Sequence, residues 1–504
     1  MFNFKKAVEE ITVENSPKAE KKKISKSLQE NRTYLKQALG DSFDVKYRDL
    51  TVSGKLMLFV MLDGMCDNLL VTEQVMLPII NADFSSVSGD KLLSKAADGV
   101  SGSIDKSVTT DLNEAITELL SGNLLMLTEG GEAAVLFSVQ SFAKRSPEEP
   151  NTESQERGSR EGFVENFKDN VAMVRRRIRS PLFKIISLEA GSTAKTRVSV
   201  CYMSDRVNPK TLDEVVDRIR SAQLDIALGS GYLQPFLNHN TASIFSCVGT
   251  TERPDVFSAK LCEGKIGIIV DGTPDALIVP HVFIENFHSL DDYLKRSYYA
   301  AFARTLKLLS FILSVFLPGV YVAVCTFHQE MIPASMIFSI TSQESKTPLP
   351  IVAEALVIHF IYEIVREAGL RIPKSVGNAI SIVGALVIGD AAVMAGLIAA
   401  PMLIVVGLTA VSSFVVPSLY EPVAILRFVF IVVGGVSGLY GIVFGFAAVL
   451  VNMASLAPYN VPYTSPLSPT KPGAWRDLIG RASWLKLGKR RMQIDKLSEQ
   501  GEKR

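Results

Sequence analysis

The hydrophobic positions divide the chain into two unlike halves. From residue 303 to residue 456, apolar runs of about 20 residues follow one another, separated by short polar turns. Only 14 of these 154 residues are Asp, Glu, Lys or Arg, and none of the 43 residues from Phe428 to Thr470 is charged. Runs of this length and composition cross a bilayer as helices. The pattern predicts an α-helical polytopic membrane domain at residues 291–457.

The charged half begins with a predicted α+β domain at residues 1–145. Lys55 to Gly64 has the apolar pattern of a buried strand, and Cys66 to Ile80 follows as a helix. Asp111 is placed to cap a helix that continues to Leu120. Two apolar runs between Gly122 and Gln140, separated by a Glu-Gly-Gly sequence, predict a β-hairpin.

A second α+β domain is predicted at residues 162–290. Residues 146–161 precede it and contain too few apolar side chains to form a core, so we expect a linker there. Thr196 to Met203 reads as a strand, and the apolar runs on either side of an Asp-Gly pair in Lys265 to Pro280 predict a second hairpin. The soluble half is therefore expected to contain two α+β domains.

Four arginines end the helix that the pattern predicts over Phe163 to Arg179. They are Arg175, Arg176, Arg177 and Arg179. Such a cluster can bind phosphate, lipid headgroups or a protein partner, but basic side chains also stabilise a helix C-terminus through its dipole. We favour the second interpretation, a solvated helix end.

The membrane domain is expected to contain four or five spanning helices. The clear spans are Phe302–Phe327, Val376–Ala395, Pro401–Val416 and Phe428–Leu456. His328 to Pro350 has an apolar run of only about ten residues, too short to cross, and is predicted to be re-entrant or interfacial. The mixed helix Pro350 to Glu367 decides between four and five crossings.

Basic residues predict the orientation of the chain. Lys295, Arg296, Arg304 and Lys307 lie at the start of the first span, which places the soluble half in the cytoplasm by the positive-inside rule. The tail at residues 458–504 is also basic and is expected to be flexible. Four crossings return this tail to the cytoplasm and five leave it outside, so the charge favours four.

Charged side chains at membrane depth are the candidates for an ion path. They are Glu354, His359, Glu363, Glu367 and Asp390. On a helical wheel His359, Glu363 and Glu367 share about 100° of arc, and Glu354 lies nearly opposite Glu363. This helix either lines an aqueous path or lies at the interface with its polar face in water, and the sequence leaves both open.

Glycines spaced four, three and four apart mark a candidate helix-packing face in the last span. They are Gly434, Gly438, Gly441 and Gly445. Small residues allow helix backbones to approach closely in lipid. We expect this stripe to serve self-assembly or packing within the chain.

Composition removes several other functions. The net charge of +1 gives no basic excess for nucleic acid, and the five scattered cysteines have no metal-ligand spacing. Nucleotide-binding, zinc-protease and serine-hydrolase motifs are absent. His281, Glu285 and His288 are close in sequence, but three isolated ligand types beside the membrane entry are weak evidence for a metal site. We therefore expect no enzyme, no cofactor and no bound metal.

Seven stretches, in order, resemble the A subunits of the GerA family of spore germinant receptors. They are EGFVENFKDNVAMVRRRIRSP (161–181), TERPD (251–255), KIGIIVDGTPDALIVP (265–280), RSYYAAFARTLKLLSFILSVFLPGVYVAV (296–324), FHQEMIP (327–333), EALVIHFIYEIVREAGLRIP (354–373) and SIVGALVIGDAAV (381–393). Within the fifth stretch, the loop residues that carry the resemblance are Phe327, His328, Gln329, Glu330 and Pro333.

The resemblance implies a multi-pass protein of the spore inner membrane with its soluble domains on the core side. It also implies partners: a transporter-like B subunit that senses the nutrient, a lipoprotein C subunit, membrane lipid and further copies of the A subunit. In this family the A subunits are thought to surround a pore that releases monovalent cations when the nutrient binds.

Two alternatives to a cation channel remain open at this stage. One is a non-conducting membrane scaffold that couples a nutrient-sensing partner to other spore proteins. The other is an A-subunit paralogue that is accessory to dipicolinate release and has no nutrient sensor of its own. A secondary transporter is less well supported, because the hydrophobic segments show no inverted repeat.

Overall fold

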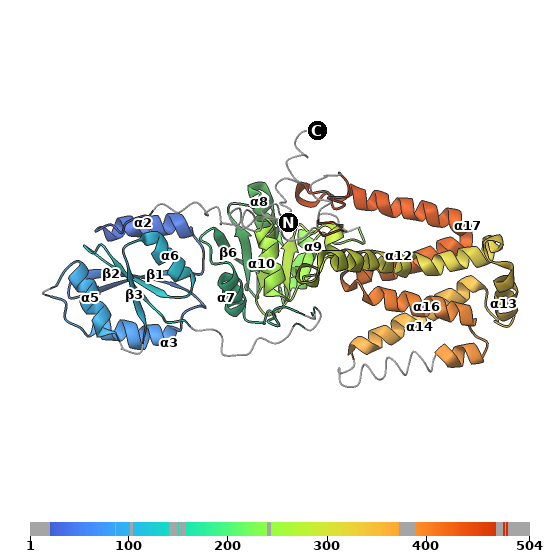
Figure 1. The fold of residues 1–504 in the computed structure, drawn as a ribbon, viewed down its shortest axis with the longest axis horizontal. Helices are drawn as coiled ribbons and strands as arrows, with labels where there is room; N and C mark the ends of the chain where they lie inside the picture. Colours follow the sequence, from blue (N-terminus) through green and yellow to red (C-terminus); the bar gives the residue numbers. More distant parts are fainter. Residues whose placement is uncertain are drawn as a thin grey trace, which may run out of the picture.

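Two β-sheet domains occupy one end of the molecule and a bundle of long helices occupies the other (Figure 1). The computed structural model describes residues 21–85, 87–100, 104–140, 150, 153, 155, 157–238, 243–371, 389–469, 477–478 and 480–481. We call residues 21–140 the first sheet domain, residues 157–287 the second sheet domain and residues 297–455 the helical half. The α+β soluble region and the helical region expected from the sequence are both confirmed.

The first sheet domain is a five-stranded antiparallel sheet between two layers of helices. Its strands, in spatial order, are β1 (Val45–Val52), β2 (Lys55–Leu62), β4 (Leu124–Thr128), β5 (Ala134–Phe137) and β3 (Lys106–Thr109). One face carries α2 (Leu28–Leu39) and α6 (Leu112–Leu120). The other face carries α3 (Asn68–Leu70), η1 (Val71–Met76), α4 (Leu77–Ile80) and α5 (Asp90–Gly99). Strand β2 is buried on both faces because successive side chains point to opposite sides.

The second sheet domain has the same architecture. Its strands, in spatial order, are β6 (Phe183–Ala190), β7 (Thr196–Met203), β9 (Ile266–Val270), β10 (Ala276–Val279) and β8 (Gly249–Thr251). One face is covered by α7 (Phe167–Arg177) and α10 (Pro254–Cys262), and the other by α8 (Pro209–Ser221) and α9 (Ser230–Leu237). Both hairpins expected from the sequence are confirmed.

The two sheet domains are structural repeats. Each places its first, second, fourth, fifth and third strands in that order, with the helices after the first hairpin on one face. A buried asparagine in the first helix of each domain makes the same contact: Asn31 accepts a hydrogen bond from Ser25 N (2.9 Å), and Asn170 accepts one from Val164 N (2.8 Å). The sequence analysis did not detect this repeat.

A buried ion pair joins the two sheet domains. Arg175 at the end of α7 donates from Nε to Asp44 Oδ2 (3.0 Å) and from Nη2 to Asp44 Oδ1 (3.1 Å), and both side chains are 2% exposed. Arg176 and Arg177 pair with Glu161. The expectation of a solvated basic helix end is therefore wrong for Arg175, because its charge is neutralised by a carboxylate of the other domain.

The predicted linker at residues 146–161 lies partly outside the described residues. Its described part rests on the second sheet domain: Arg253, which is 1% exposed, donates to Glu153 O (3.3 Å) and Ser159 O (2.7 Å). Thr251 Oγ1 also donates to Glu153 Oε2 (2.7 Å). These residues are thus held by the domain that they precede.

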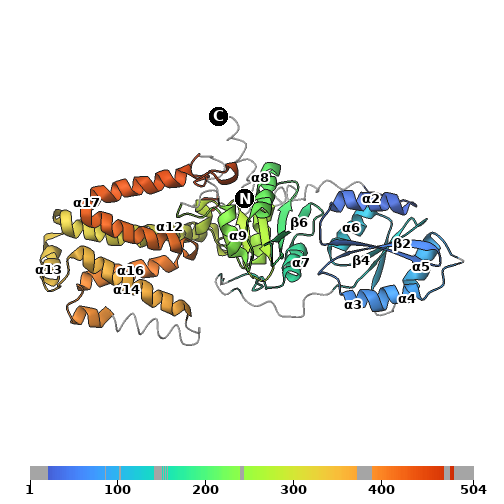
Figure 2. The same ribbon diagram turned by 180° about the vertical axis from the view of Figure 1, so that it is seen from behind.

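The helical half consists of long helices that run to and from the sheet domains (Figure 2). Its helices are α12 (Ser297–Phe327), α13 (Ala334–Glu344), α14 (Ile351–Arg371), α16 (Ala400–Phe414) and α17 (Tyr420–Ser455). Among the described residues, two stretches are long and apolar enough to cross a membrane, Ser297–Phe327 and Pro417–Ser455. Most of the expected span Val376–Ala395 lies outside the described residues.

The expectation of one straight helix from Phe428 to Leu456 is wrong. Gly438 leaves the helical conformation (φ 62°, ψ −152°), and α17 reverses there into two arms (Figure 1). This backbone conformation is accessible essentially only to glycine. Each arm is about 26 Å long at the rise of an α-helix, close to the thickness of a bilayer core.

The predicted flexible tail at residues 458–504 is also corrected where the structure describes it. Tyr459 is 1% exposed and donates a hydrogen bond from its hydroxyl to Leu237 O in the second sheet domain (2.8 Å). Tyr463 O accepts from Phe283 N (2.9 Å). These residues are therefore packed, because their aromatic rings complete the core of that domain.

The buried pair between the sheet domains generates a stability prediction. We expect Asp44→Asn to leave the Arg175 charge buried without its partner and to lower the free energy of unfolding by about 3–5 kcal/mol. The matched control is Asp49→Asn, because Asp49 pairs with Arg32 near the surface, with side chains 43% and 30% exposed; exposed pairs contribute about 0–1 kcal/mol. Urea unfolding of the full chain in detergent measures both. Equal effects of the two substitutions would contradict the role of the pair.

Candidate functional site

The core of the helical half lies where four helices meet. Apolar side chains of α12, α14, α16 and the first arm of α17 form one cluster, which includes Val322, Ala355, Met402 and Ile431. The polar side chains predicted for an ion path on α14 lie next to this cluster. The site is therefore a small polar region inside an apolar bundle.

Glu354 is fully buried at the start of α14. Its Oε1 accepts a hydrogen bond from Ala399 N (2.6 Å), the residue that precedes α16, so the carboxylate lies at the positive end of that helix. Its other oxygen, Oε2, is buried without a hydrogen-bond partner among the described residues. Glu344 in α13, to which Tyr321 donates (3.4 Å), is its acidic neighbour. Neighbouring carboxyl groups disfavour each other's ionised form, so this pair favours a proton or a cation over two bare charges. The sequence analysis did not single out Glu344.

Glu363 lies toward α17 and is held by two arginines. Its carboxylate accepts from Arg366 Nε (3.0 Å) and Arg427 Nη1 (3.2 Å), and from the Tyr420 hydroxyl. Arg427 is fully buried and also donates to Ser314 O in α12 (3.1 Å). Glu363 is thus the counter-ion that permits a buried arginine.

Arg427 was missed by the sequence analysis, although a signal for it exists. It is the only charged residue between Pro422 and Thr470. A single charge in such a long apolar stretch is expected to face a partner inside the protein. Pairing it with Glu363 required the three-dimensional structure.

The other predicted path residues are divided between the interior and the surface. His359 is fully buried, its Nδ1 lies 2.8 Å from Ala355 O, and its Nε2 has no partner among the described residues. Glu367 is half exposed and pairs with Arg371 (2.8 Å), and Asp390 is exposed. The structure therefore brings Glu354, His359 and Glu363 into the bundle and leaves Glu367 and Asp390 outside it.

The four predicted packing glycines do not share one helix face, because the chain reverses at Gly438. Gly434 lies against α12: a Cβ on it would be 2.4 Å from Gly319 O. Gly441 and Gly445 both lie on the second arm. A Cβ on Gly445 would be 2.8 Å from the Phe430 ring, and Gly441 contacts Val433 and Ser437 at the end of the first arm. Close helix packing therefore depends on Gly434 and on Gly319, which the sequence analysis did not select.

The family-motif loop packs against this reversal at the end of the molecule far from the sheets. A Cβ on Gly438 would be 3.1 Å from His328 Nε2 and 3.3 Å from Phe327 Cβ. Gln329 Nε2 donates to Cys325 O (2.9 Å), and Glu330 lies 3.6 Å from His328 Nδ1. Pro333 directly precedes α13. The loop thus closes the end of α12 onto the turn between the arms of α17.

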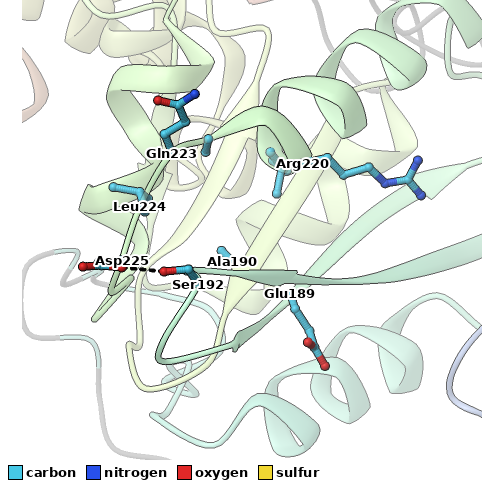
Figure 3. A pocket seen from close by; sticks show the side chains of 10 residues that line it. Glu189, Ala190, Ser192, Arg220, Gln223, Leu224 and Asp225 are labelled. Atoms are coloured by element: carbon cyan, nitrogen blue, oxygen red, sulfur yellow. Dashed lines mark hydrogen bonds between the residues drawn. The ribbon is translucent and has the colours of Figure 1, made fainter.

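A separate open groove of about 680 Å³ lies in the second sheet domain (Figure 3). Glu189, Ser192, Arg220 and Asp225 line it, and Ser192 Oγ donates to Asp225. None of the residues predicted from the sequence lies there. Among the described residues, no three His, Cys, Asp or Glu side chains come together as a metal site.

Comparisons with known proteins agree on one family. The family described as Bacillus/Clostridium GerA spore germination protein matches residues 33–493. The chain is 36% identical over 478 residues to spore germination protein KA of Bacillus subtilis (strain 168), which covers 94% of this chain and 88% of that protein. It is also 36% identical over 386 residues to the uncharacterised membrane protein YfkQ of the same strain, covering 76% and 75%.

A solved structure is also similar to this chain. The N-terminal domain of the A subunit of the Bacillus megaterium spore germinant receptor GerK3 aligns with 52% of this chain and 98% of that chain, at 26% identity and a TM-score of 0.41. The family match covers both the sheet domains and the helical half. The chain therefore belongs to the GerA family of spore germination proteins, as an A-type subunit.

The contact between Gly434 and Gly319 generates a second prediction. We expect Gly434→Ala to force α12 and α17 apart, because the added methyl group would meet backbone rather than a flexible side chain. Gly407→Ala in α16 is the control, since no atom lies within 4 Å of its added methyl group and alanine favours a helix. Thermal unfolding in detergent should show a lower midpoint for the first variant only. A midpoint at or above that of the wild type for Gly434→Ala would contradict the assigned contact.

Proposed function

We propose that this chain is the A subunit of a nutrient-responsive germinant receptor and forms, with further copies, a channel that releases monovalent cations. The observation that carries the proposal is the family match over residues 33–493, which includes both the sheet domains and the polar region inside the bundle. The proposed partners are a transporter-like B subunit and a lipoprotein C subunit.

The surface of the helical half supports a place in the inner membrane of the spore. Large apolar side chains face outward on several helices: Phe338 is 79% exposed, Phe444 74%, Ile404 72% and Val436 72%. A water-soluble protein rarely exposes so many on one part of its surface, whereas lipid or another subunit would cover them. We therefore propose a multi-pass protein in which lipid and neighbouring copies surround these helices.

The two ends of the helical half support the proposed orientation. α12 begins next to the second sheet domain, and the residues after α17 return to the same domain through Tyr459 and Tyr463. An even number of crossings is needed for both ends to lie on one side. Together with the basic residues before α12, this favours sheet domains and tail on the spore-core side.

The polar region supports the passage of cations. Glu344 and Glu354 place two carboxyl groups at the far end of the bundle, where a cation would replace a shared proton. Glu363 is a weaker candidate than Glu354 for contact with cations, because Arg366 and Arg427 already neutralise its carboxylate. In the proposed mechanism, Glu354 provides negative charge along the path, and the sheet domains transmit the signal from the nutrient-sensing partner.

Potassium flux from liposomes containing the purified protein, with and without the B and C subunits, tests the proposal. We expect Glu354→Gln to lower the flux several-fold, because it removes a buried negative charge that cations would meet. Glu367→Gln is the control, since Glu367 is at the surface and pairs with Arg371. Potassium release from spores after nutrient addition should follow the same order.

Two results would contradict this proposal. Flux no greater than from empty liposomes, with all subunits present, would favour a non-conducting scaffold. Equal flux through the wild type, Glu354→Gln and Glu367→Gln would keep the channel but remove Glu354 from its path.

A further inference from the structure

Both ends of the helical half are attached to the second sheet domain by a shared core. This core contains Phe283 and Phe287 from the end of the domain, Val315 from α12, Met453 from the second arm of α17 and Leu478 from the tail. Leu478 is 1% exposed although it follows the last helix by more than twenty residues. The tail is therefore part of the junction between the two halves.

Arg304 at the start of α12 connects this junction electrostatically. Its side chain is 1% exposed and donates from Nε to Asp292 Oδ2 (3.1 Å) and from Nη1 to Asp477 Oδ1 (2.9 Å). The same Nη1 lies 3.0 Å from Leu478 O. One arginine thus binds the end of the second sheet domain, the first long helix and the tail.

The tail makes further contacts on both sides of Arg304. Tyr293 donates from its hydroxyl to Asp477 Oδ2 (2.8 Å), and Arg481 donates to Lys295 O (2.9 Å) and to Asp292 O. His288 Nε2 lies 2.9 Å from Leu478 O. Burial, with the nearby Arg304 charge, lowers the pKa of His288 to about 4, so the neutral ring donates to this carbonyl.

The tail supplies the second of the two carboxylates that pair with Arg304. Asp292 and Asp477 both pair with Arg304, Lys307 lies 3.4 Å from Asp292, and Arg481 donates to backbone carbonyls beside them. Without Asp477, one acidic group would face several positive ones in a buried position. An uncompensated buried charge is costly, so the tail is held in place by the same charges that it neutralises.

We propose that Asp477, Leu478 and Arg481 form a clasp that couples the second sheet domain to both ends of the helical half. A movement of the domain is then transmitted to α12 through Arg304 and to α17 through the shared core. This goes beyond the proposed function in giving the tail a transmitting role, and it depends on that function only for its physiological readout.

Hydrogen exchange of the full chain in detergent tests the clasp itself. Asp477→Asn is expected to increase amide exchange at residues 288–300 about tenfold, because it removes one carboxylate from Arg304 and Tyr293. Asp477→Glu keeps the charge and should restore much of the protection. Glu421→Gln, at an exposed position of α17, is the control and should not change exchange there.

Nutrient-triggered potassium release from spores tests the coupling. We expect Asp477→Asn to lower the release several-fold while the flux through the purified protein in liposomes stays within twofold of the wild type. Unchanged exchange in Asp477→Asn would overturn the clasp, and increased exchange with unchanged release would overturn its coupling role. If the wild type conducts no potassium, the channel proposal fails, but the exchange experiment still decides whether the clasp exists.

Discussion

A buried charge must have its counter-ion inside the protein, and this constraint holds the molecule together. Among the residues that the structure describes, four arginines are at most 2% exposed, and each joins segments that are far apart in the chain. Arg175 binds the first sheet domain to the second, and Arg253 binds the residues before the second domain to it. Arg304 binds the sheets to the helices, and Arg427 binds α17 to α14 and α12. Each of these four contacts between separate segments therefore contains a buried guanidinium group.

The two sheet domains share one internal architecture but make different contacts with the rest of the chain. Both domains have the same strand order and the same buried asparagine contact, so their internal architectures are equivalent. The outer surfaces of the two domains differ. The first domain contributes Asp44 and Asp63 to the contact with its repeat, whereas the second contributes Arg175 and Lys168 on that side and packs against the helices and the tail on the other. The second domain is thus the part of the chain that connects the first domain to the helical half.

Local sequence patterns predicted the helices and strands well. Contacts between residues that are distant in the sequence could not be predicted from them. Short apolar runs and the turn residues beside them identified β2, β7 and both hairpins, because each of these signals is complete within a few neighbouring residues. The partner of Arg175 is 131 positions away, so charge at a helix end could not separate a solvated cluster from a junction. The reversal at Gly438 was hidden, since a glycine within an apolar run fits a packing stripe equally well. For the candidate site, the sequence identified Glu354, His359 and Glu363 but not Glu344, Arg427 or Gly319.

The reversal at Gly438 also makes α17 a lever. The two arms are joined through the torsion angles of one residue, and the tip of the second arm lies about 25 Å from it. A change of about 10° in those angles would displace this tip by about 4 Å, given the length of a 17-residue helix. The loop from Phe327 to Pro333 contacts Gly438 at the far end of the bundle. A shift of this loop can therefore move the end of the second arm beside the sheets while both arms stay helical.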